Sequence, residues 1–323
     1  MAPYHPPAEG REGKLRLDFN ENTVGCSPNV AEFLRQAITA DALTIYPEYS
    51  GARTELAQFF NVTEDQFLIT NGTDEAIQIL VNTYINEGDE VMIQQPSYAM
   101  YRFYTESAGA NVGQALSPAT KAVLIANPNN PTGAALDLGA IRQVLESTPK
   151  AAVLIDEAYY EFHGETVLPW IGHYPNLFVS RTFSKAYGMA AMRVGCIFSN
   201  AENISWLRKA QSPYSVNALA ALAARAAIRD TEYVKAYAAE VIAARQQAAE
   251  GLESLGIQYI PSRANFILFN AGDRAIEIRD ILRDRAILIR DRSYEIPGHL
   301  RVTIGNREQT ARFLTELETA WKR

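Results

Sequence analysis

A lysine flanked by hydroxyl side chains is the first candidate for chemistry in this chain. Lys185 ends the segment SRTFSK at residues 180–185, between an apolar run and a glycine-containing turn, and Arg193 follows eight residues later. Burial and nearby positive charge lower the pKa of a lysine amine, and the neutral amine is the form that attacks a carbonyl to make a Schiff base. A single lysine is more often a solvated surface charge. This segment therefore indicates chemistry only together with the other polar motifs of the chain.

Two further segments place polar side chains after apolar runs. Asp156 ends the run AAVLID at residues 151–156. A buried carboxylate there needs a partner, which could be a cationic ring nitrogen or a neighbouring lysine. The heptapeptide NPNNPTG at residues 127–133 contains two prolines and three asparagines, which predict either a rigid turn that presents amide side chains or a plain tight loop.

The tetrapeptide NGTD at residues 71–74 joins the apolar run FLIT to a predicted helix. Gly72 lets the turn close, and the first N–H groups of the helix are then free to bind an anion such as phosphate. Many strand–helix turns have this composition, so the tetrapeptide alone indicates phosphate binding only weakly.

Apolar runs predict the strands that must position these segments. The runs lie at residues 67–70, 90–95, 122–127, 151–156, 177–182 and 193–199. Runs without polar alternation suit strands buried on both faces, and strands separated by helices predict a largely parallel sheet. Ligands bind at the carboxyl ends of the strands in open α/β sheets, so we expect the four segments to meet at that edge.

The pattern changes after the last of these runs and predicts a second unit. Long helices are predicted first, and closely spaced strands and helices then follow up to the C-terminus. We expect an α/β fold with a large domain at residues 41–215, whose mostly parallel sheet is flanked by helices, and a smaller α+β C-terminal domain at residues 216–323. Residues 1–40 are expected to form an N-terminal arm and a first helix, which Ser27 and Pro28 begin and which packs with the small domain.

Composition and charge exclude several classes of protein. The chain has 323 residues and a net charge of −7, which argues against a nucleic acid or an anionic membrane as partner. No signal-peptide core and no long apolar run are present, so we expect a cytoplasmic protein whose two cysteines are reduced. The four histidines are not spaced as metal ligands, and GxSxG, P-loop and GxGxxG motifs are missing from the sequence, so no metal site, serine hydrolase, kinase or Rossmann oxidoreductase is expected.

Taken together, these segments resemble the pyridoxal-phosphate-dependent aminotransferases of fold type I, and most closely the histidinol-phosphate aminotransferase branch. The resemblance covers nearly the whole chain and rests on LDFNEN (17–22), IYPEYSG (45–51), NGTDEAI (71–77), QPSYAMY (95–101), NPNNPTG (127–133), IDEAY (155–159), SRTFSKAYG (180–188) and HLRVTIGNRE (299–308). It implies pyridoxal 5'-phosphate as the cofactor and a homodimer with shared active sites.

The resemblance also implies roles around the cofactor ring. Lys185 would form the Schiff base and later move the proton during transfer. Asp156 would pair with the pyridinium nitrogen, which keeps the ring an electron sink. Asn130 and Tyr159 would hydrogen-bond the phenolic oxygen.

Other residues would contact the ring face and the phosphate. Tyr98 would stack on the ring, whereas Tyr101 on the same helix is expected only to pack. The phosphate would be held by the backbone of Gly72 and Thr73 and by the side chains of Thr182, Ser184 and Arg193. Tyr46 would reach this phosphate from the partner subunit, so each site would need two subunits.

The substrate-binding residues are implied in the same way. Arg301 would bind the carboxylate of the amino acid, and Asn22 would contact the substrate. Arg290 would bind a substrate phosphate or side-chain anion, for which arginine is better suited than lysine. A salt bridge from Arg290 to Asp291 or Asp284 is the alternative.

The implied activity is a ping-pong transfer of amino groups between histidinol phosphate and 2-oxoglutarate, in histidine biosynthesis. An aromatic amino-acid aminotransferase and, less favoured, a threonine-phosphate decarboxylase are the alternatives. The segment between Tyr98 and Asn127 is short for the family, which predicts that a strand and hairpin of the large domain are missing.

Overall fold

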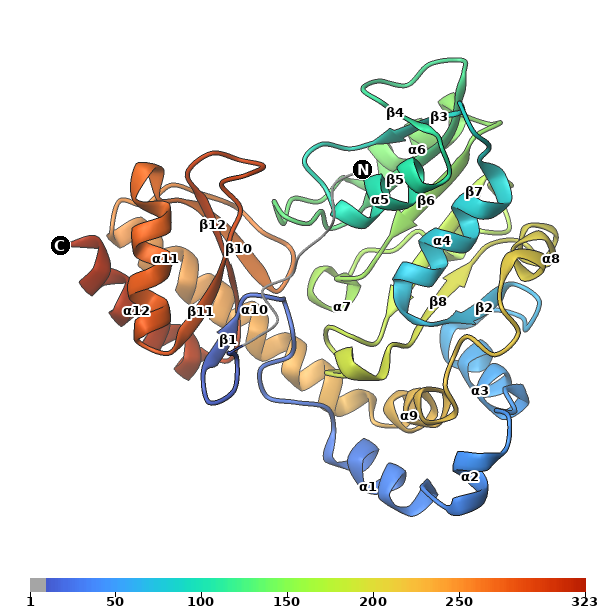
Figure 1. Ribbon diagram of the computed structural model, residues 1–323, viewed down its shortest axis with the longest axis horizontal. Helices are drawn as coiled ribbons and strands as arrows, with labels where there is room; N and C mark the ends of the chain where they lie inside the picture. Colours follow the sequence, from blue (N-terminus) through green and yellow to red (C-terminus); the bar gives the residue numbers. More distant parts are fainter. Residues whose placement is uncertain (1–9) are drawn as a thin grey trace.

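Seven strands form the larger of two sheets in the computed structural model, which describes residues 10–323 (Figure 1). In spatial order they are β2 (Phe67–Thr70), β8 (Gly195–Phe198), β7 (Leu177–Thr182), β6 (Ala152–Asp156), β5 (Thr120–Ala126), β3 (Glu90–Ile93) and β4 (Asn111–Gly113). The strands from β7 to β4 pair in parallel, and β8 runs antiparallel to both of its neighbours. The expected mostly parallel sheet is confirmed.

Helices cover both faces of this sheet, as its uninterrupted apolar strands require. One layer contains α4 (Gly72–Tyr84), α5 (Ala99–Ser107) and α8 (Ala201–Ala210); the other contains α3 (Ser50–Phe60), α6 (Leu138–Ser147) and α9 (Ala218–Arg229). In β6, Leu154 packs into the first layer, and Val153 and Ile155 pack into the second. All three side chains are fully buried, so β6 ends in an apolar interior.

Five strands form the smaller sheet. In spatial order they are β1 (Leu15–Leu17), β11 (Ile287–Asp291), β12 (His299–Thr303), β10 (Phe266–Asn270) and β9 (Tyr259–Ile260). α11 (Ala275–Asp284) packs on β11, and α12 (Arg307–Trp321) packs on α11. Because β1 pairs in parallel with β11, the N-terminal segment completes a sheet of C-terminal residues. The domain boundaries expected at residues 40 and 215 stay a prediction.

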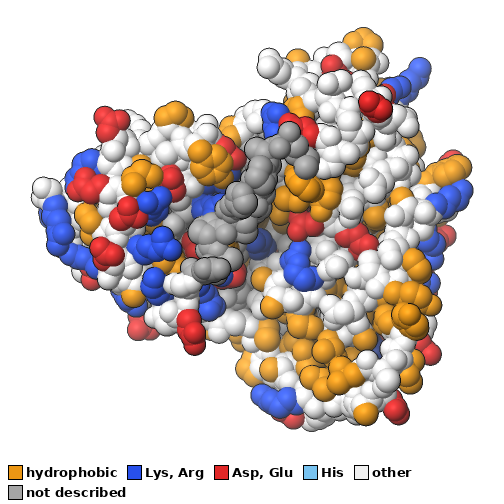
Figure 2. Space-filling model, viewed as in Figure 1, with side chains coloured by type: hydrophobic (Ala, Val, Ile, Leu, Met, Phe, Trp, Pro, Cys, Tyr) orange, Lys and Arg blue, Asp and Glu red, His pale blue; other side chains and the backbone are white. Residues whose placement is uncertain are grey.

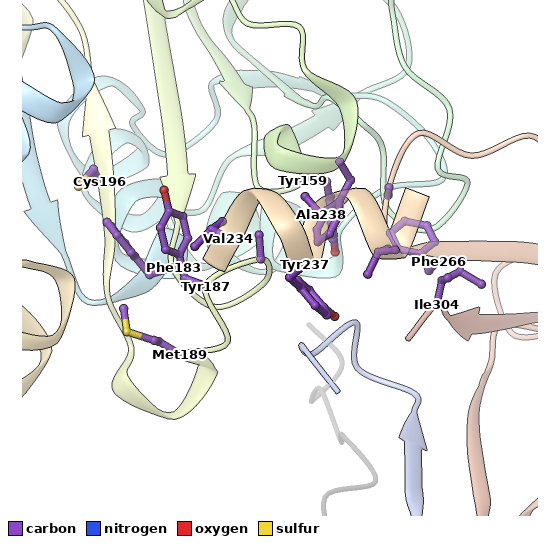
Figure 3. Close-up of a cluster of buried hydrophobic side chains, with 14 of the residues drawn as sticks. Tyr159, Phe183, Tyr187, Met189, Cys196, Val234, Tyr237, Ala238, Phe266 and Ile304 are labelled. Carbon is purple, nitrogen blue, oxygen red and sulfur yellow. The ribbon is translucent and has the colours of Figure 1, made fainter. Parts of the chain in front are cut away.

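The 24-residue helix α10 (Thr231–Ser254) connects the two lobes. Figure 3 shows Val234 and Ala238 on this helix, with Tyr187 of the larger lobe on one side and Phe266 of the smaller lobe on the other. All four side chains belong to one buried cluster. The lobes therefore share a close-packed core, which fixes the geometry of residues that lie between them.

Short helices complete the described chain: α1 (Pro28–Ala37), α2 (Ala40–Thr44), α7 (Tyr160–His163), η1 (Leu168–Trp170), η2 (Ala190–Met192) and η3 (Gly272–Arg274). α1 begins as expected, with the Ser27 side chain accepting the N–H of Asn29 and Pro28 in first position. The segment expected to lack a strand and hairpin runs through α5, β4 and β5. Within residues 10–323 no helix is both long and apolar enough to cross a bilayer.

Candidate active site

The carboxyl ends of β5, β6 and β7 contribute residues to a cavity of about 250 Å³, which side chains of both lobes enclose. Its lining comprises Phe19, Asn20, Glu21, Thr73, Asp74, Tyr98, Ala99, Tyr101, Ala126, Asn130, Asp156, Ala158, Tyr159, Thr182, Ser184, Lys185, Ala190, Arg193, Arg290, Arg292 and Arg301. Every expected site residue except Gly72, Tyr46 and Asn22 lies on this cavity. The four polar segments therefore meet at one edge of the sheet.

Lys185 follows β7 and is held by a tight turn that rests on the N-terminal segment. Its Nζ donates to the carbonyl oxygen of Phe19 at 3.1 Å. Gly188 closes the turn with a φ of +70°, and a Cβ there would lie 2.7 Å from backbone atoms of the N-terminal segment. Burial, together with the positive charges of Arg301 and Arg193, lowers the pKa of Lys185 to about 8. The pKa of Lys185 is therefore shifted in the direction expected from the sequence.

Asp156 ends β6 with both carboxylate oxygens hydrogen-bonded. The Ser180 hydroxyl donates to Oδ1 at 2.8 Å, and the Tyr101 hydroxyl donates to Oδ2 at 2.9 Å. Burial raises the pKa of Asp156 to about 6, although these two bonds oppose the shift. Both partners are hydroxyls rather than the lysine considered above, so the charge of the carboxylate stays available to a cationic ring nitrogen.

The structure corrects the expectation for Tyr101. It was expected only to pack, but it is fully buried and holds Asp156. The signal in the sequence was its spacing from Tyr98, because residues three apart lie on one face of a helix. Both rings line the cavity, and the Tyr98 hydroxyl donates to Asp74 at 2.8 Å.

The anion-binding part of the cavity surrounds the start of α4. Gly72 has a φ of +70°, and a Cβ there would lie 2.4 Å from Nη2 of Arg193, so glycine is what lets Arg193 cross the helix N-terminus. Arg193 donates to the Asp74 carboxylate at 3.0 Å and to the Ser184 hydroxyl at 3.4 Å. The side chains of Thr73, Thr182 and Ser184 line the same cavity. A helix N-terminus, an arginine and several hydroxyls together suit a phosphate.

Two arginines of the smaller lobe face the cavity from adjacent strands. Arg290 of β11 and Arg301 of β12 are direct partners in the sheet. Arg301 donates to Oδ1 of Asn130 at 2.5 Å and to the carbonyl oxygen of Asp18 at 2.9 Å. The guanidinium of Arg290 lies 5.5 Å from the ring centroid of Phe19. The two expected substrate arginines are therefore side by side.

No ion pair of Arg290 with a carboxylate forms within residues 10–323. The alternative partner Asp291 lies 3.7 Å from Arg279 instead. Arg292, which sequence reasoning missed, lines the cavity and forms an ion pair with Glu295. The signal was its spacing from Arg290, since residues two apart along a strand share a face.

The N-terminal segment brings further polar groups that sequence reasoning missed. Asn20 and Glu21 line the cavity, and Nδ2 of Asn20 donates to the Tyr159 hydroxyl oxygen at 3.0 Å. Asn22 lies outside the cavity lining, and its side chain donates to the carbonyl oxygen of Ala186 at 3.0 Å. The motif LDFNEN pointed to this segment, but which asparagine faces the site depends on the left-handed φ of 56° at Asn20.

Tyr46 lies on the surface, outside the cavity lining. It is 73% exposed, and its ring centroid is 4.5 Å from that of Tyr214. Figure 2 shows hydrophobic side chains gathered over the lower part of the molecule, where Figure 1 places α1, α2 and α9. Exposed apolar side chains on or next to α1 and α2 include Ile38, Leu43 and Ile45. An apolar patch of this kind is typical of a protein interface.

The groups in the cavity fit a phosphorylated aldehyde that has a basic ring nitrogen. The amine of Lys185 can condense with the aldehyde, the carboxylate of Asp156 can pair with the protonated nitrogen, and the start of α4 can hold the phosphate. Fold and site therefore define an α/β enzyme that works through such a cofactor.

Comparison with known proteins agrees with this class. The family described as "Aminotransferase class I and II" matches residues 12–317. The histidinol-phosphate aminotransferase of Symbiobacterium thermophilum is 37% identical, over 99% of this chain and 96% of that protein. The histidinol-phosphate aminotransferase of Sinorhizobium meliloti, solved in complex with pyridoxal-5'-phosphate, has a TM-score of 0.85 at 22% identity and covers 95% of this chain and 90% of its own. The L-threonine-O-3-phosphate decarboxylase of Porphyromonas gingivalis has a TM-score of 0.84 at 23% identity and covers 96% of this chain and 100% of its own.

The chain belongs to the class I and II aminotransferases. It is an enzyme of the pyridoxal-phosphate-dependent aminotransferase type, and the expected fold type, cofactor and class of activity are confirmed. The roles expected of individual residues stay predictions.

Proposed function

We propose that this aminotransferase moves amino groups between histidinol phosphate and 2-oxoglutarate, in the biosynthesis of histidine. The observation that carries the proposal is Arg290, which is only 8% exposed on the cavity and lies beside Arg301 without a carboxylate partner among the described residues. A buried charge is costly unless a ligand supplies the opposite one. A phosphate monoester supplies it, and the S. thermophilum relative, named for histidinol phosphate, supports that choice.

The ping-pong order follows from the sharing of one site. The phosphate of histidinol phosphate and the carboxylates of 2-oxoglutarate both need the arginines of β11 and β12, and the cavity of about 250 Å³ offers a single set. The two substrates would therefore occupy it in turn. Arginine suits both anions because its planar guanidinium binds carboxylate and phosphate in bidentate fashion.

Residues of the chain would then handle the proton and the charge. Pyridoxal phosphate, when bound, supplies an electron sink that eases removal of a proton from the substrate carbon. Lys185 would hold the cofactor through its amine, and the same amine would act as the base that carries the proton. Its pKa of about 8 leaves a useful neutral fraction near physiological pH. Asp156 would pair with the protonated ring nitrogen.

Two hydrogen bonds set the polarity of Tyr159 and Asn130, the residues that would hold the phenolic oxygen of the cofactor. Asn20 donates to the Tyr159 oxygen, so the hydroxyl hydrogen of Tyr159 is left to point elsewhere. Arg301 donates to Oδ1 of Asn130, so the amide N–H group of Asn130 is left as a donor. Both residues line the cavity, where they can donate to an oxyanion.

We also propose a cytoplasmic homodimer in which Tyr46 binds the phosphate in the partner's site. The support is the exposed apolar patch over α1, α2 and α9, which a second copy of the chain would cover. Tyr46 follows α2 directly, and its ring lies against that of Tyr214. Light scattering measures the assembly, and a monomer with full activity contradicts the proposal. Tyr46→Phe should leave the dimer intact while weakening cofactor affinity several-fold, because only the hydroxyl is lost.

The decisive assay compares substrates. The purified enzyme with 2-oxoglutarate should form glutamate faster from histidinol phosphate than from phenylalanine. Equal or faster turnover of phenylalanine would favour the aromatic amino-acid aminotransferase. Release of carbon dioxide from threonine phosphate without glutamate formation would favour the decarboxylase, whose fold is the same as that of this chain.

A further inference from the structure

A second cavity borders the turn that carries Lys185, through the side chain of Tyr187. It has a volume of about 630 Å³, and α10, α7, η1 and the C-terminal end of α3 supply its walls. None of its lining residues lines the active-site cavity. Tyr187, two residues after Lys185, forms part of its wall together with Val234 and Ala238 of α10 (Figure 3). A concave space of this size is typical of sites for small organic molecules.

The walls of this second cavity are mainly apolar. Besides the three residues above, Phe60, Leu168 and Ile171 contribute side chains. Several of these side chains are otherwise part of the buried core, so their open faces border the cavity rather than another side chain. Filling the space with an apolar group removes this surface from water, which stabilises the complex by about 25 cal/mol per Å².

One carboxyl group on the second cavity, that of Glu161, has no hydrogen-bond or ion-pair partner among the other described residues. The Glu161 side chain, on α7, makes no hydrogen bond and no ion pair within 4 Å to any other residue in the range 10–323. Burial raises the pKa of Glu161 to about 7, and the charge of Arg181 opposes the shift only in part. A carboxyl group in an apolar wall is stabilised in its charged form by a ligand that brings a positive charge to it.

Each of the two basic side chains on the same cavity has a carboxylate partner. Arg181 donates to the Glu157 carboxylate at 2.7 Å, and its guanidinium lies 3.4 Å from the ring centroid of Tyr160. Lys235 forms an ion pair with Glu232 at 2.8 Å. Glu161 is therefore the acidic group on the cavity that lacks such a partner among the described residues. Its ionised form, which is partly populated near neutral pH, selects against an anionic ligand.

We propose that the second cavity is a binding site for a small organic cation, whose apolar body fills the space between α3 and α10 and whose protonated amine hydrogen-bonds to Glu161. The amine would form a charge-assisted bond with the carboxylate, the stronger class of hydrogen bond. The cation leaves the active-site cavity open, so it binds together with the cofactor and with the substrates.

The probe for this site is N,N-dimethyl-2-phenylethylamine, a tertiary amine that cannot form a Schiff base with the cofactor. Calorimetric titration of the holoenzyme should detect one bound probe per subunit, and saturation with histidinol phosphate should leave the affinity unchanged. The matched anion, 3-phenylpropanoate, should bind at least about tenfold more weakly, as expected for loss of a charge-assisted bond worth about 1.5–3 kcal/mol.

Variants locate the site. Glu161→Gln should weaken probe binding at least about tenfold, whereas Glu165→Gln, the same change at an exposed carboxylate four residues away that is not on the cavity, should not. Ala238→Leu adds three carbon atoms to the cavity wall, narrows the cavity and should weaken probe binding. Unchanged affinity in Glu161→Gln, equal binding of the anion, or displacement of the probe by histidinol phosphate each overturns the proposal. Displacement of the probe would mean that the probe binds in the active site. It would not contradict the proposed aminotransferase activity.

Discussion

The hydroxyl of Tyr101 donates a 2.9 Å hydrogen bond to Oδ2 of Asp156, from a side chain that solvent does not reach. Ser180 holds the other oxygen of the same carboxylate. These bonds connect α5 and β7 to the end of β6 and fix the direction in which Asp156 faces the cavity. They also oppose the effect of burial on the pKa of Asp156, so they help to keep this group charged at neutral pH.

Tyr101→Phe removes this donor and keeps the ring. The pKa of Asp156 should rise, because the lost bond favours its charged form, and the acid limb of the kcat/KM profile should move to higher pH. We expect kcat near pH 7 to fall about tenfold and the unfolding free energy to fall by about 1–2 kcal/mol. Tyr104→Phe, on the same helix, should leave the acid limb in place. An acid limb that does not move in Tyr101→Phe contradicts the role assigned to this bond.

Gly72→Ala tests the phosphate site. A Cβ at residue 72 would lie 2.4 Å from Nη2 of Arg193, so Arg193 must leave the start of α4 and the affinity for pyridoxal phosphate should fall at least about tenfold. Gly88→Ala is the matched control, because Gly88 also has a positive φ but has open space around it. Both variants should lose about 1 kcal/mol of stability to backbone strain, and only Gly72→Ala should lose cofactor affinity. Equal cofactor affinity in the two variants contradicts the assignment.

Arg290→Lys tests substrate recognition. Lysine keeps the charge but loses the bidentate geometry, so kcat/KM for histidinol phosphate should fall about tenfold, mainly through KM. Arg290→Ala should reduce it by about a hundredfold or more. Arg283→Lys, at an exposed position on α11, should change neither kcat/KM nor KM for histidinol phosphate. A loss that is the same for phenylalanine and for histidinol phosphate would show that Arg290 does not recognise the phosphate.

The lowered pKa of Lys185 makes the stability of the cofactor-free enzyme depend on pH. Between pH 8 and 10.5 the unfolded chain carries a proton on this amine that the folded chain lacks, so the free energy of unfolding should rise with pH. The slope from this group is at most about 1.4 kcal/mol per pH unit, and it vanishes below the folded pKa, where both states are protonated. Urea unfolding at several pH values in this window measures it. Lys185→Met should remove this contribution to the slope. Equal slopes in the unchanged protein and the variant would contradict the lowered pKa of Lys185.

Residues that follow strand ends were predictable from the sequence alone. Lys185, Asp156 and Asn130 each stand in a short motif next to an apolar run, and parallel strands bring their carboxyl ends to one edge. The order of apolar runs also predicted the parallel part of the sheet, because such runs must be buried on both faces. These inferences need only local sequence and the general geometry of sheets.

What the tertiary structure decided depends on contacts between distant segments. Asn20 reaches Tyr159 because β1 pairs with β11, more than two hundred residues later in the chain, and Arg292 enters the cavity through the same sheet. Tyr101 bonds to Asp156 because α5 packs across the end of β6. Local pattern determines which segments carry chemistry, but the partner of each side chain is set by packing of the two lobes, which no single stretch of sequence encodes.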